Sequence, residues 1–275
     1  MDWQEISSSW VLIPPRPIGI VHFLGGAFIA AAPQVTYRSL LEQLGSQGYG
    51  VIATPFLNTL DHTAIARDVL NSFETTLGRL QARNLLPQQY LPIYGVGHSM
   101  GCKLHLLIGS LFSVERAGNI LISFNNYPAK RAIPLLEQLN INSAKRAIPL
   151  LEQLNINPVF DFDVEFIPSP QQTNELITDN YQVRRNLLIK FTNDEIDQTL
   201  SLKPILQQRF PNMVALQKLP GNHLTPLGQD INWQTGEVFT PLDAVGQWIK
   251  QGLSKDLNQL KREISRWLNP LGGRW

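Results

Sequence analysis

The sequence predicts an α/β fold in which helices cover both faces of a mostly parallel sheet. Short apolar segments alternate with longer segments of helical periodicity along most of the chain. The short segments are apolar throughout, which is typical of strands that are buried on both faces. The chain has 275 residues, enough for one large domain with a sizeable core. We therefore expect a single domain over residues 1–275.

The first third of the chain supplies the opening elements. Residues 10–13 and 18–23 have the composition of strands, and the proline-rich break between them favours an antiparallel hairpin or a sheet edge. A helix is expected over 35–44, a strand over 50–53 and a long helix over 61–83, because leucine, isoleucine and valine recur there at the spacing of each element.

The rest of the chain repeats this alternation with one interruption. Strands are predicted at 92–96, 119–124, 187–191 and 213–219, and a helix is predicted to begin near residue 200. Together with the opening elements, these segments form the parallel part of the predicted sheet.

A Gly-x-Ser-x-Gly sequence joins the predicted strand at 92–96 to a helix. Gly97, Ser99 and Gly101 have the spacing of a nucleophile elbow, a sharp turn that exposes its central serine. The two glycines let strand and helix approach each other closely. The first amide of the helix, that of Met100, would then lie where an oxyanion forms.

Two other interpretations of this segment stay open. It can be an ordinary buried turn, since Gly-x-Ser-x-Gly also occurs by chance. It also resembles a dinucleotide-binding loop through Gly95, Gly97 and Gly101, but such a loop needs its third glycine where Met100 stands. It further needs an acidic residue at the end of the next strand, where residues 121–124 are Leu-Ile-Ser-Phe.

A glycine-bearing loop follows the strand at 18–23. Its backbone amides can approach a reacting atom closely, and it occupies the place of the second oxyanion donor in α/β-hydrolases. The candidate donors are the amides of Leu24 and Gly25, in addition to Met100. A plain tight turn between a strand and a helix is the alternative.

A serine nucleophile needs a general base, and the base needs an acid that orients it. Among the five histidines, only His223 follows the elbow helix, in a Gly-Asn-His loop after a strand. In α/β-hydrolases the chain order is serine, acid, histidine. The acid lies in the loop after the strand that precedes the histidine's strand. Asp194 is our choice and Asp197 the second candidate. An ordinary loop histidine and a solvated or helix-capping aspartate are the alternatives.

The interruption is a segment of about 125–181, which we expect to form a small lid over the elbow. It contains fourteen residues, AKRAIPLLEQLNIN, at 129–142 and again at 144–157. Two copies are too few for a solenoid, so the tandem copy indicates a duplication within a surface insertion.

Three acidic residues in this segment, Asp161, Asp163 and Glu165, alternate along the chain. Converging carboxylates could bind a hard metal ion, but the glycine spacing of a calcium loop is missing and a solvated strand face is favoured. We therefore expect neither a metal nor another cofactor.

Composition excludes several classes of function. The formal net charge of +1 gives no electrostatic footprint for nucleic acid. The only cysteine, Cys102, permits no internal disulfide and fits a reducing compartment. The N-terminus lacks the features of a signal peptide, and the longest apolar run, 18–32, is too short for a transmembrane segment. These features predict a cytoplasmic protein.

The C-terminal tail, 253–275, carries leucine, isoleucine and tryptophan at helical spacing with interleaved lysine and arginine. Docking of this amphipathic helix on the domain is one interpretation. A peripheral contact with a membrane surface or a partner protein is the other.

The strings GHSMG, ISFNNYP and LPGNHLTP, at 97–101, 122–128 and 219–226, give the chain a family resemblance. It resembles the family of unknown function 1350 (DUF1350), an α/β-hydrolase-like family found in cyanobacteria and plastids, over roughly residues 10–253. The resemblance implies the α/β-hydrolase fold and, by position, the triad Ser99, Asp194 and His223. It implies no particular substrate.

The expected function is that of a serine hydrolase or acyltransferase acting on an ester or thioester, with a small-molecule or lipid-like acyl substrate. A non-catalytic hydrolase scaffold that serves as a binding or assembly factor is the main alternative. An oxidoreductase or lyase that uses His223 without an acyl-enzyme is a third.

Overall fold

The computed structural model describes residues 1–27, 29–87, 90–132, 165–227 and 253–269. Within these ranges, one sheet has eight strands in the order β1-β2-β4-β3-β5-β6-β7-β8. The strands are β1 (Gln4–Ile6), β2 (Ser9–Leu12), β3 (Gly19–Leu24), β4 (Tyr49–Ala53), β5 (Ile93–His98), β6 (Gly118–Ile122), β7 (Asn186–Phe191) and β8 (Val214–Leu219). All neighbours from β4 to β8 are parallel.

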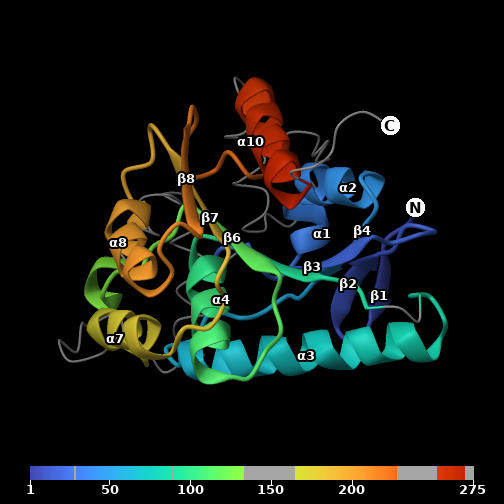
Figure 1. Ribbon diagram of the computed structural model, residues 1–275, viewed down its shortest axis with the longest axis horizontal. Helices are drawn as coiled ribbons and strands as arrows, with labels where there is room; N and C mark the ends of the chain where they lie inside the picture. Colours follow the sequence, from blue (N-terminus) through green and yellow to red (C-terminus); the bar gives the residue numbers. More distant parts are fainter. Residues whose placement is uncertain (28, 88–89, 133–164, 228–252, 270–275) are drawn as a thin grey trace, which may run out of the picture.

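Helices lie on both faces of the sheet, as Figure 1 shows. One face packs against α1 (Pro33–Thr36), α2 (Arg38–Ser46) and α10 (Leu253–Leu268). The other packs against α3 (His62–Ala82), α4 (Met100–Leu111), α7 (Pro170–Asn180) and α8 (Thr199–Arg209). The central strands β3, β4 and β6 are buried at every position, which explains why their sequences are apolar at nearly every position. The predicted α/β fold is confirmed.

The expected opening hairpin is wrong in its pairing. β2 pairs antiparallel with β1 and with β4, whereas β3 lies beyond β4 and runs parallel to it. The hairpin is formed instead by β1 and β2, because Ser7 and Ser8 both take positive φ values and make the tight turn. The proline-rich break after β2 leads across to the interior of the sheet.

The last part of the segment expected as a lid contains helix α7. A capping box at Ser169 and Gln172 starts this helix, and Ile177 packs in the core with Cys102 of α4 and Leu202 of α8. Residues 170–180 thus belong to the layer that covers the sheet. Most of the duplicated sequence lies in 133–164, outside the described residues, and so do Asp161 and Asp163.

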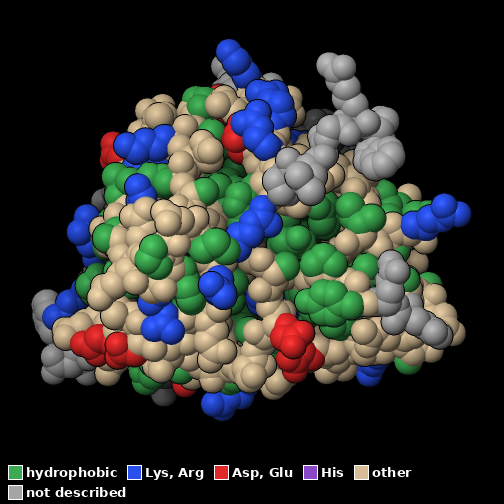
Figure 2. All heavy atoms as spheres, viewed as in Figure 1, with side chains coloured by type: hydrophobic (Ala, Val, Ile, Leu, Met, Phe, Trp, Pro, Cys, Tyr) green, Lys and Arg blue, Asp and Glu red, His purple; other side chains and the backbone are tan. Residues whose placement is uncertain are grey.

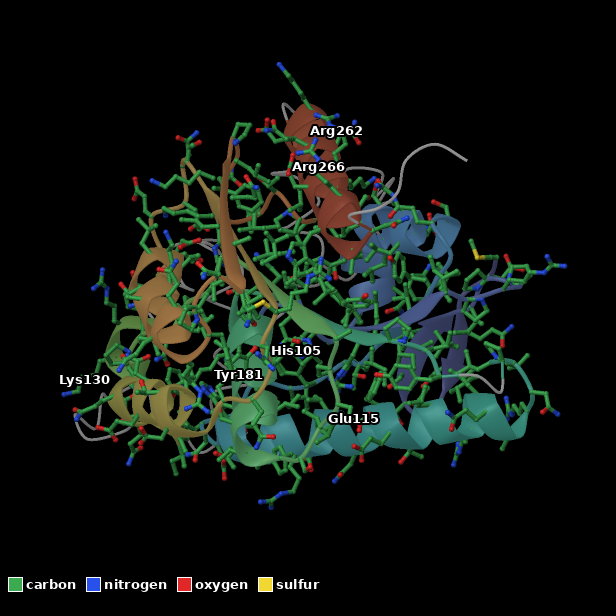
Figure 3. All side chains as sticks on the ribbon, viewed as in Figure 1. His105, Glu115, Lys130, Tyr181, Arg262 and Arg266 are labelled. Atoms are coloured by element: carbon green, nitrogen blue, oxygen red, sulfur yellow. The ribbon has the colours of Figure 1, made fainter. Side chains whose placement is uncertain are left out.

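The described part of the C-terminal tail docks on the domain. Four apolar residues of α10 are buried in the same core cluster as strands β3 to β8: Leu257, Leu260, Ile264 and Leu268. Arg262 and Arg266, labelled on α10 in Figure 3, are exposed. The apolar stripe that could have faced a membrane or a partner is therefore occupied by the sheet.

The surface carries no concentrated charge on the face that Figure 2 presents. Lysine and arginine side chains are scattered there between apolar and uncharged polar ones. Among the described helices, none combines the length and the apolar character needed to cross a membrane.

Helix α3 offers a prediction about stability. Its start is fixed by Asp61, whose side chain accepts a hydrogen bond from the Ala64 amide at 2.8 Å. Gly78 lies on its exposed side, and a Cβ added there would have no atom within 4 Å. We expect Gly78→Ala to increase the free energy of unfolding by about 1 kcal/mol, because alanine loses less backbone entropy in a helix. Thermal unfolding measures this, and a lower Tm than that of the wild type would contradict it.

Candidate active site

Ser99 occupies a strained turn between β5 and α4. Its backbone has φ 54° and ψ −117°, outside the regions that serine ordinarily adopts, and its amide donates to the Ile122 carbonyl at 2.9 Å. A Cβ on Gly97 would lie 2.6 Å from the Gly101 carbonyl carbon, and one on Gly101 would collide with the Leu24 carbonyl. Only glycine fits at both positions, which is the local requirement of a nucleophile elbow.

The loops after β7 and β8 bring an acid and a base together. His223 Nδ1 lies 2.9 Å from Asp194 Oδ2, and both residues are buried. The histidine turn is held by Asn222, whose amide donates to Thr225 Oγ1 and whose side chain accepts from the Leu224 amide. Burial alone would raise the pKa of Asp194, but the hydrogen bond from His223 and its charge hold that pKa below its ordinary value.

The second candidate acid has other partners. Asp197 accepts hydrogen bonds from the backbone amide and the hydroxyl of Thr199, and it lies 3.7 Å from the Lys190 ammonium. Its carboxylate therefore forms an Asx turn just before α8. The structure places Asp194, and not Asp197, against His223.

Ser99 Oγ has a partner that the sequence did not predict. The Asn125 side-chain amide donates to Ser99 Oγ at 3.0 Å, whereas no hydrogen bond among the described residues joins Ser99 to His223. Since the oxygen accepts from Asn125, the proton of the hydroxyl is free to point elsewhere.

A buried series of hydrogen bonds connects the loop after β3, which contains Gly26, to the loop after β8, which contains His223. The Gly26 amide donates to the Tyr37 hydroxyl at 2.9 Å, and this hydroxyl lies 2.7 Å from His98 Nδ1. His98 Nε2 lies 2.9 Å from the His223 carbonyl oxygen. Burial and the nearby His223 lower the pKa of His98 to about 3, so the ring is neutral. The consistent assignment has Tyr37 donating to Nδ1 and Nε2–H donating to His223.

A substitution of Tyr37 tests whether this series of hydrogen bonds stabilises the site. Tyr37→Phe leaves the Gly26 amide and His98 Nδ1 without partners inside the protein, so we expect a loss of about 1–3 kcal/mol in the free energy of unfolding. Urea denaturation measures the loss. Tyr49→Phe is the matched control, because the Tyr49 ring is also buried but its hydroxyl makes no hydrogen bond among the described residues. Equal stability of the two variants would contradict the prediction.

Of the three expected oxyanion donors, Met100 lines the cavity beside Ser99, whereas Leu24 and Gly25 do not. The Met100 amide is the first of α4 and has no acceptor within that helix. Leu24 ends β3, and its carbonyl rather than its side chain faces Gly101, while Gly25 packs against the Tyr37 ring. Among the described loop residues, Ala27 lines the cavity beside Ser99, and Leu24 and Gly25 do not.

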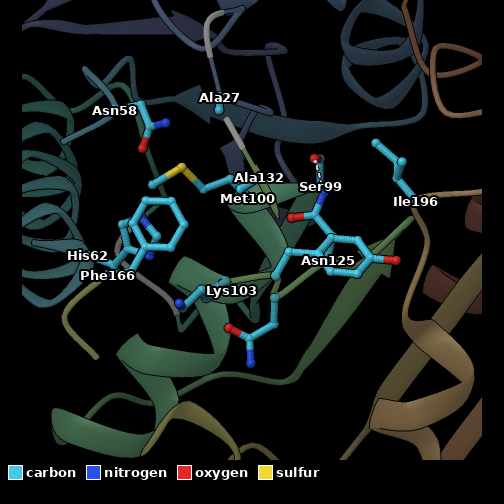
Figure 4. Close-up of a pocket in the computed structure, with 12 residues that line it drawn as sticks. Ala27, Asn58, His62, Ser99, Met100, Lys103, Asn125, Ala132, Phe166 and Ile196 are labelled. Atoms are coloured by element: carbon cyan, nitrogen blue, oxygen red, sulfur yellow. Dashed lines mark hydrogen bonds between the residues drawn. The ribbon is translucent and has the colours of Figure 1, made fainter. Parts of the chain in front are cut away.

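A cavity of about 40 Å³ opens beside Ser99, at the carboxyl ends of the parallel strands (Figure 4). Lys103, His62 and Phe166 lie together on one side of it, while the Asn125 amide lies close to Ser99. The remaining described lining includes Asn58, Met100, Asn126, Tyr127, Ala132 and Ile196. The arrangement provides a serine nucleophile, an Asp–His pair on neighbouring loops, and a small cavity that reaches the serine.

Sequence reasoning missed Asn125, Tyr37, His98, His62 and Lys103 as residues of this region. For Asn125 a signal existed, since it lies three residues after the end of β6, the strand next to the elbow strand. The position of Lys103, one helical turn after Ser99, was another signal. Tyr37 and His62 come from distant segments, and no local pattern indicates their contacts.

Solved structures of hydrolases share this fold. The chain matches an esterase of Pyrococcus furiosus, PF2001, with a TM-score of 0.59 and 13% identity, over 96% of this chain and 86% of that one. It matches FphF, a fluorophosphonate-binding serine hydrolase of Staphylococcus aureus, with a TM-score of 0.55 and 13% identity, over 95% and 92%. It matches a carboxyl esterase of Bacillus coagulans with a TM-score of 0.55 and 14% identity, over 96% of this chain and 93% of that one.

Among curated proteins, none matches this sequence. The family model described as "Protein of unknown function (DUF1350)" matches residues 2–270, nearly the whole chain. The resemblance seen in the three sequence strings is thereby confirmed, and the fold is that of the α/β-hydrolases. The chain belongs to the DUF1350 family.

Proposed function

We propose that this protein is a serine hydrolase that cleaves an ester or thioester through an acyl-enzyme at Ser99. The observation that carries the proposal is the strained elbow of Ser99 together with the 2.9 Å contact between His223 and Asp194 on the loops after β8 and β7. The hydrolase fold of the family supports it. Ser99 and His223 come from segments more than 120 residues apart in the sequence, and both follow strands of the same parallel sheet.

In the proposed reaction, Ser99 Oγ forms a bond to the acyl carbon and transfers its proton to His223 Nε2. The Met100 amide and an amide of the loop 24–27 stabilise the oxyanion, each by roughly 3 kcal/mol if aligned. As the bond to the alcohol or thiol breaks, His223 returns the proton to that leaving group. Water then attacks the acyl-enzyme with His223 as base, releasing the acid and restoring Ser99. Asp194 orients the imidazole and stabilises its protonated form.

Asn125 would restrain Ser99 in the absence of substrate. Its amide donates to Ser99 Oγ, so the hydroxyl has to turn toward His223 when a substrate enters. Hydrogen bonds of catalytic groups are often long in the free enzyme and tighten in the complex.

A fluorophosphonate bearing a fluorophore tests the proposal directly. Such a reagent phosphonylates an activated serine, and we expect stoichiometric labelling that peptide mapping locates at Ser99. Ser99→Ala should remove the label, whereas Ser110→Ala, on the same helix and also buried, should keep it. Wild-type protein that is folded but takes up no label would contradict the proposal.

The second candidate is a binding scaffold without catalysis. It is favoured by one observation, namely that Ser99 Oγ accepts a hydrogen bond from Asn125, whereas no hydrogen bond among the described residues joins it to His223. Removing the tail from residue 253 does not separate the two candidates, because α10 forms part of the core. Labelling at Ser99 separates them, since a pure scaffold has no need of an activated serine.

A further inference from the structure

Lys103 is a buried cation in the cavity beside Ser99. Only 2% of its surface is exposed, and its ammonium donates to the Pro168 carbonyl at 3.1 Å and lies 5.5 Å from the centre of the Phe166 ring. No carboxylate among the described residues forms an ion pair with it. An ammonium has three donors, so this one keeps hydrogen-bonding capacity for a ligand.

The carboxylate whose charge acts on Lys103, that of Glu165, is hydrogen-bonded to the backbone. Glu165 Oε1 accepts hydrogen bonds from the Ala129 and Phe166 amides, each at 2.8 Å. Its charge favours the protonated form of Lys103 from a longer distance, but burial has the larger effect and lowers the Lys103 pKa to about 7. The positive charge of the cavity is thus uncompensated by direct contact.

His62 is a buried polar group without a hydrogen-bond partner among the described residues, and it lines the same cavity. It is 4% exposed, and neither ring nitrogen has a hydrogen-bond partner among the described residues. The ring stacks on Phe166 with centroids 4.3 Å apart, and burial followed by the Lys103 charge lowers its pKa to about 3. A neutral imidazole still offers one N–H donor. Buried polar groups without partners are rare, and an unpartnered imidazole beside an ammonium with spare donors indicates a ligand.

The backbone holds this site in place. The Thr63 amide donates to the Ile167 carbonyl and the Ile167 amide donates to the Leu60 carbonyl, at 3.1 and 2.9 Å. These bonds join the segment before α3 to the segment that carries Phe166 and Pro168, and therefore fix His62 and Lys103 relative to each other.

We infer that the cavity recognises a carboxylate on the acyl part of the substrate, through the Lys103 ammonium and an N–H of His62. This inference rests on the proposed function. Because Lys103 follows Ser99 by one helical turn, the carboxylate would end a short chain that begins at the acyl carbon on Ser99. A cavity of about 40 Å³ holds roughly three water molecules, which suits a compact anion. The substrate class is a half-ester or half-thioester of a short dicarboxylic acid.

The test compares two activated esters of similar shape, 4-nitrophenyl hydrogen glutarate and 4-nitrophenyl 5-methylhexanoate, in which an isopropyl group replaces the carboxylate. We expect the wild type to prefer the glutarate in kcat/KM by about 10–100-fold, the range of a hydrogen bond to a charged group. Lys103→Met should reduce this ratio at least 10-fold. Lys218→Met, at an exposed position on β8, should keep the wild-type ratio.

Binding of free glutarate provides a readout without catalysis. In Ser99→Ala protein, calorimetry should detect glutarate, and the added Lys103→Met substitution should weaken its binding at least 10-fold. If both esters are hydrolysed equally and glutarate does not bind, the inference is wrong and the proposed function stands. If glutarate binds through Lys103 but neither ester is hydrolysed, the carboxylate site stands and the proposed function is wrong.

Discussion

Asp194→Asn is expected to lower kcat for hydrolysis of an activated ester about 10⁴-fold. The asparagine has nearly the same shape, but its amide can present a donor to His223 Nδ1, where the carboxylate only accepts. The imidazole would then carry its proton on Nε2 and could not accept one from Ser99. The loss should appear in kcat more than in KM, because Asp194 does not line the cavity.

Asp197→Asn is the matched control for this prediction. The two aspartates lie three residues apart in the same loop, and both side chains are fully buried. Asp197 bonds to Thr199 and not to His223, so its substitution should reduce stability while changing kcat less than 10-fold. Steady-state kinetics and urea denaturation of both variants distinguish the roles. A larger fall in kcat for Asp197→Asn than for Asp194→Asn would reverse the assignment of the acid.

Lys103→Met is expected to increase the free energy of unfolding by about 1–4 kcal/mol at neutral pH. Methionine has a similar volume and removes a buried ammonium that no carboxylate contacts among the described residues, although it leaves the Pro168 carbonyl without a donor. If Lys103 served only to stabilise the fold, its substitution would instead decrease the free energy of unfolding. A gain in stability would therefore indicate that the lysine serves the ligand.

The pH dependence of this gain follows from the pKa of Lys103. The folded-state pKa is about 7, below the ordinary value of 10.5, so between these values the unfolded chain binds more protons. The wild type should therefore become relatively more stable as pH rises through this window. The advantage of Lys103→Met should be largest below pH 7 and decline toward pH 10. Urea titrations at pH 6, 8 and 10 measure it, and an advantage that grows with pH would contradict the assignment.

The parallel part of the fold could be predicted because its signals are local. β3, β4 and β6 are buried along their whole length, so their sequences are apolar at nearly every position. The pairing of β2 could not be predicted in this way. The sequence shows where a strand ends, but whether the chain turns back or crosses to another position depends on contacts with β1 and β4.

The candidate site was partly predictable for a related reason. Chain order and strand ends suffice to nominate Ser99, Asp194 and His223, since the carboxyl ends of parallel strands meet at one edge of the sheet. The contacts of Tyr37 with Gly26 and His98 depend on the exact approach of distant segments. The cavity surface made by His62 and Lys103 also depends on the approach of distant segments. The charge states of these two side chains depend on burial rather than on residue type.

Helix α10 has a consequence for how the chain folds during synthesis. Its leucines and isoleucine belong to a cluster that also contains residues of α2 and of strands β2 to β8, yet they are synthesised after every described strand. Until they leave the ribosome, the apolar side chains that α10 contacts on this face lack that cover, although every described strand has already emerged. The nascent chain would be more exposed to chaperones and to aggregation during this interval, because the cluster is complete only once residues 253–268 have emerged.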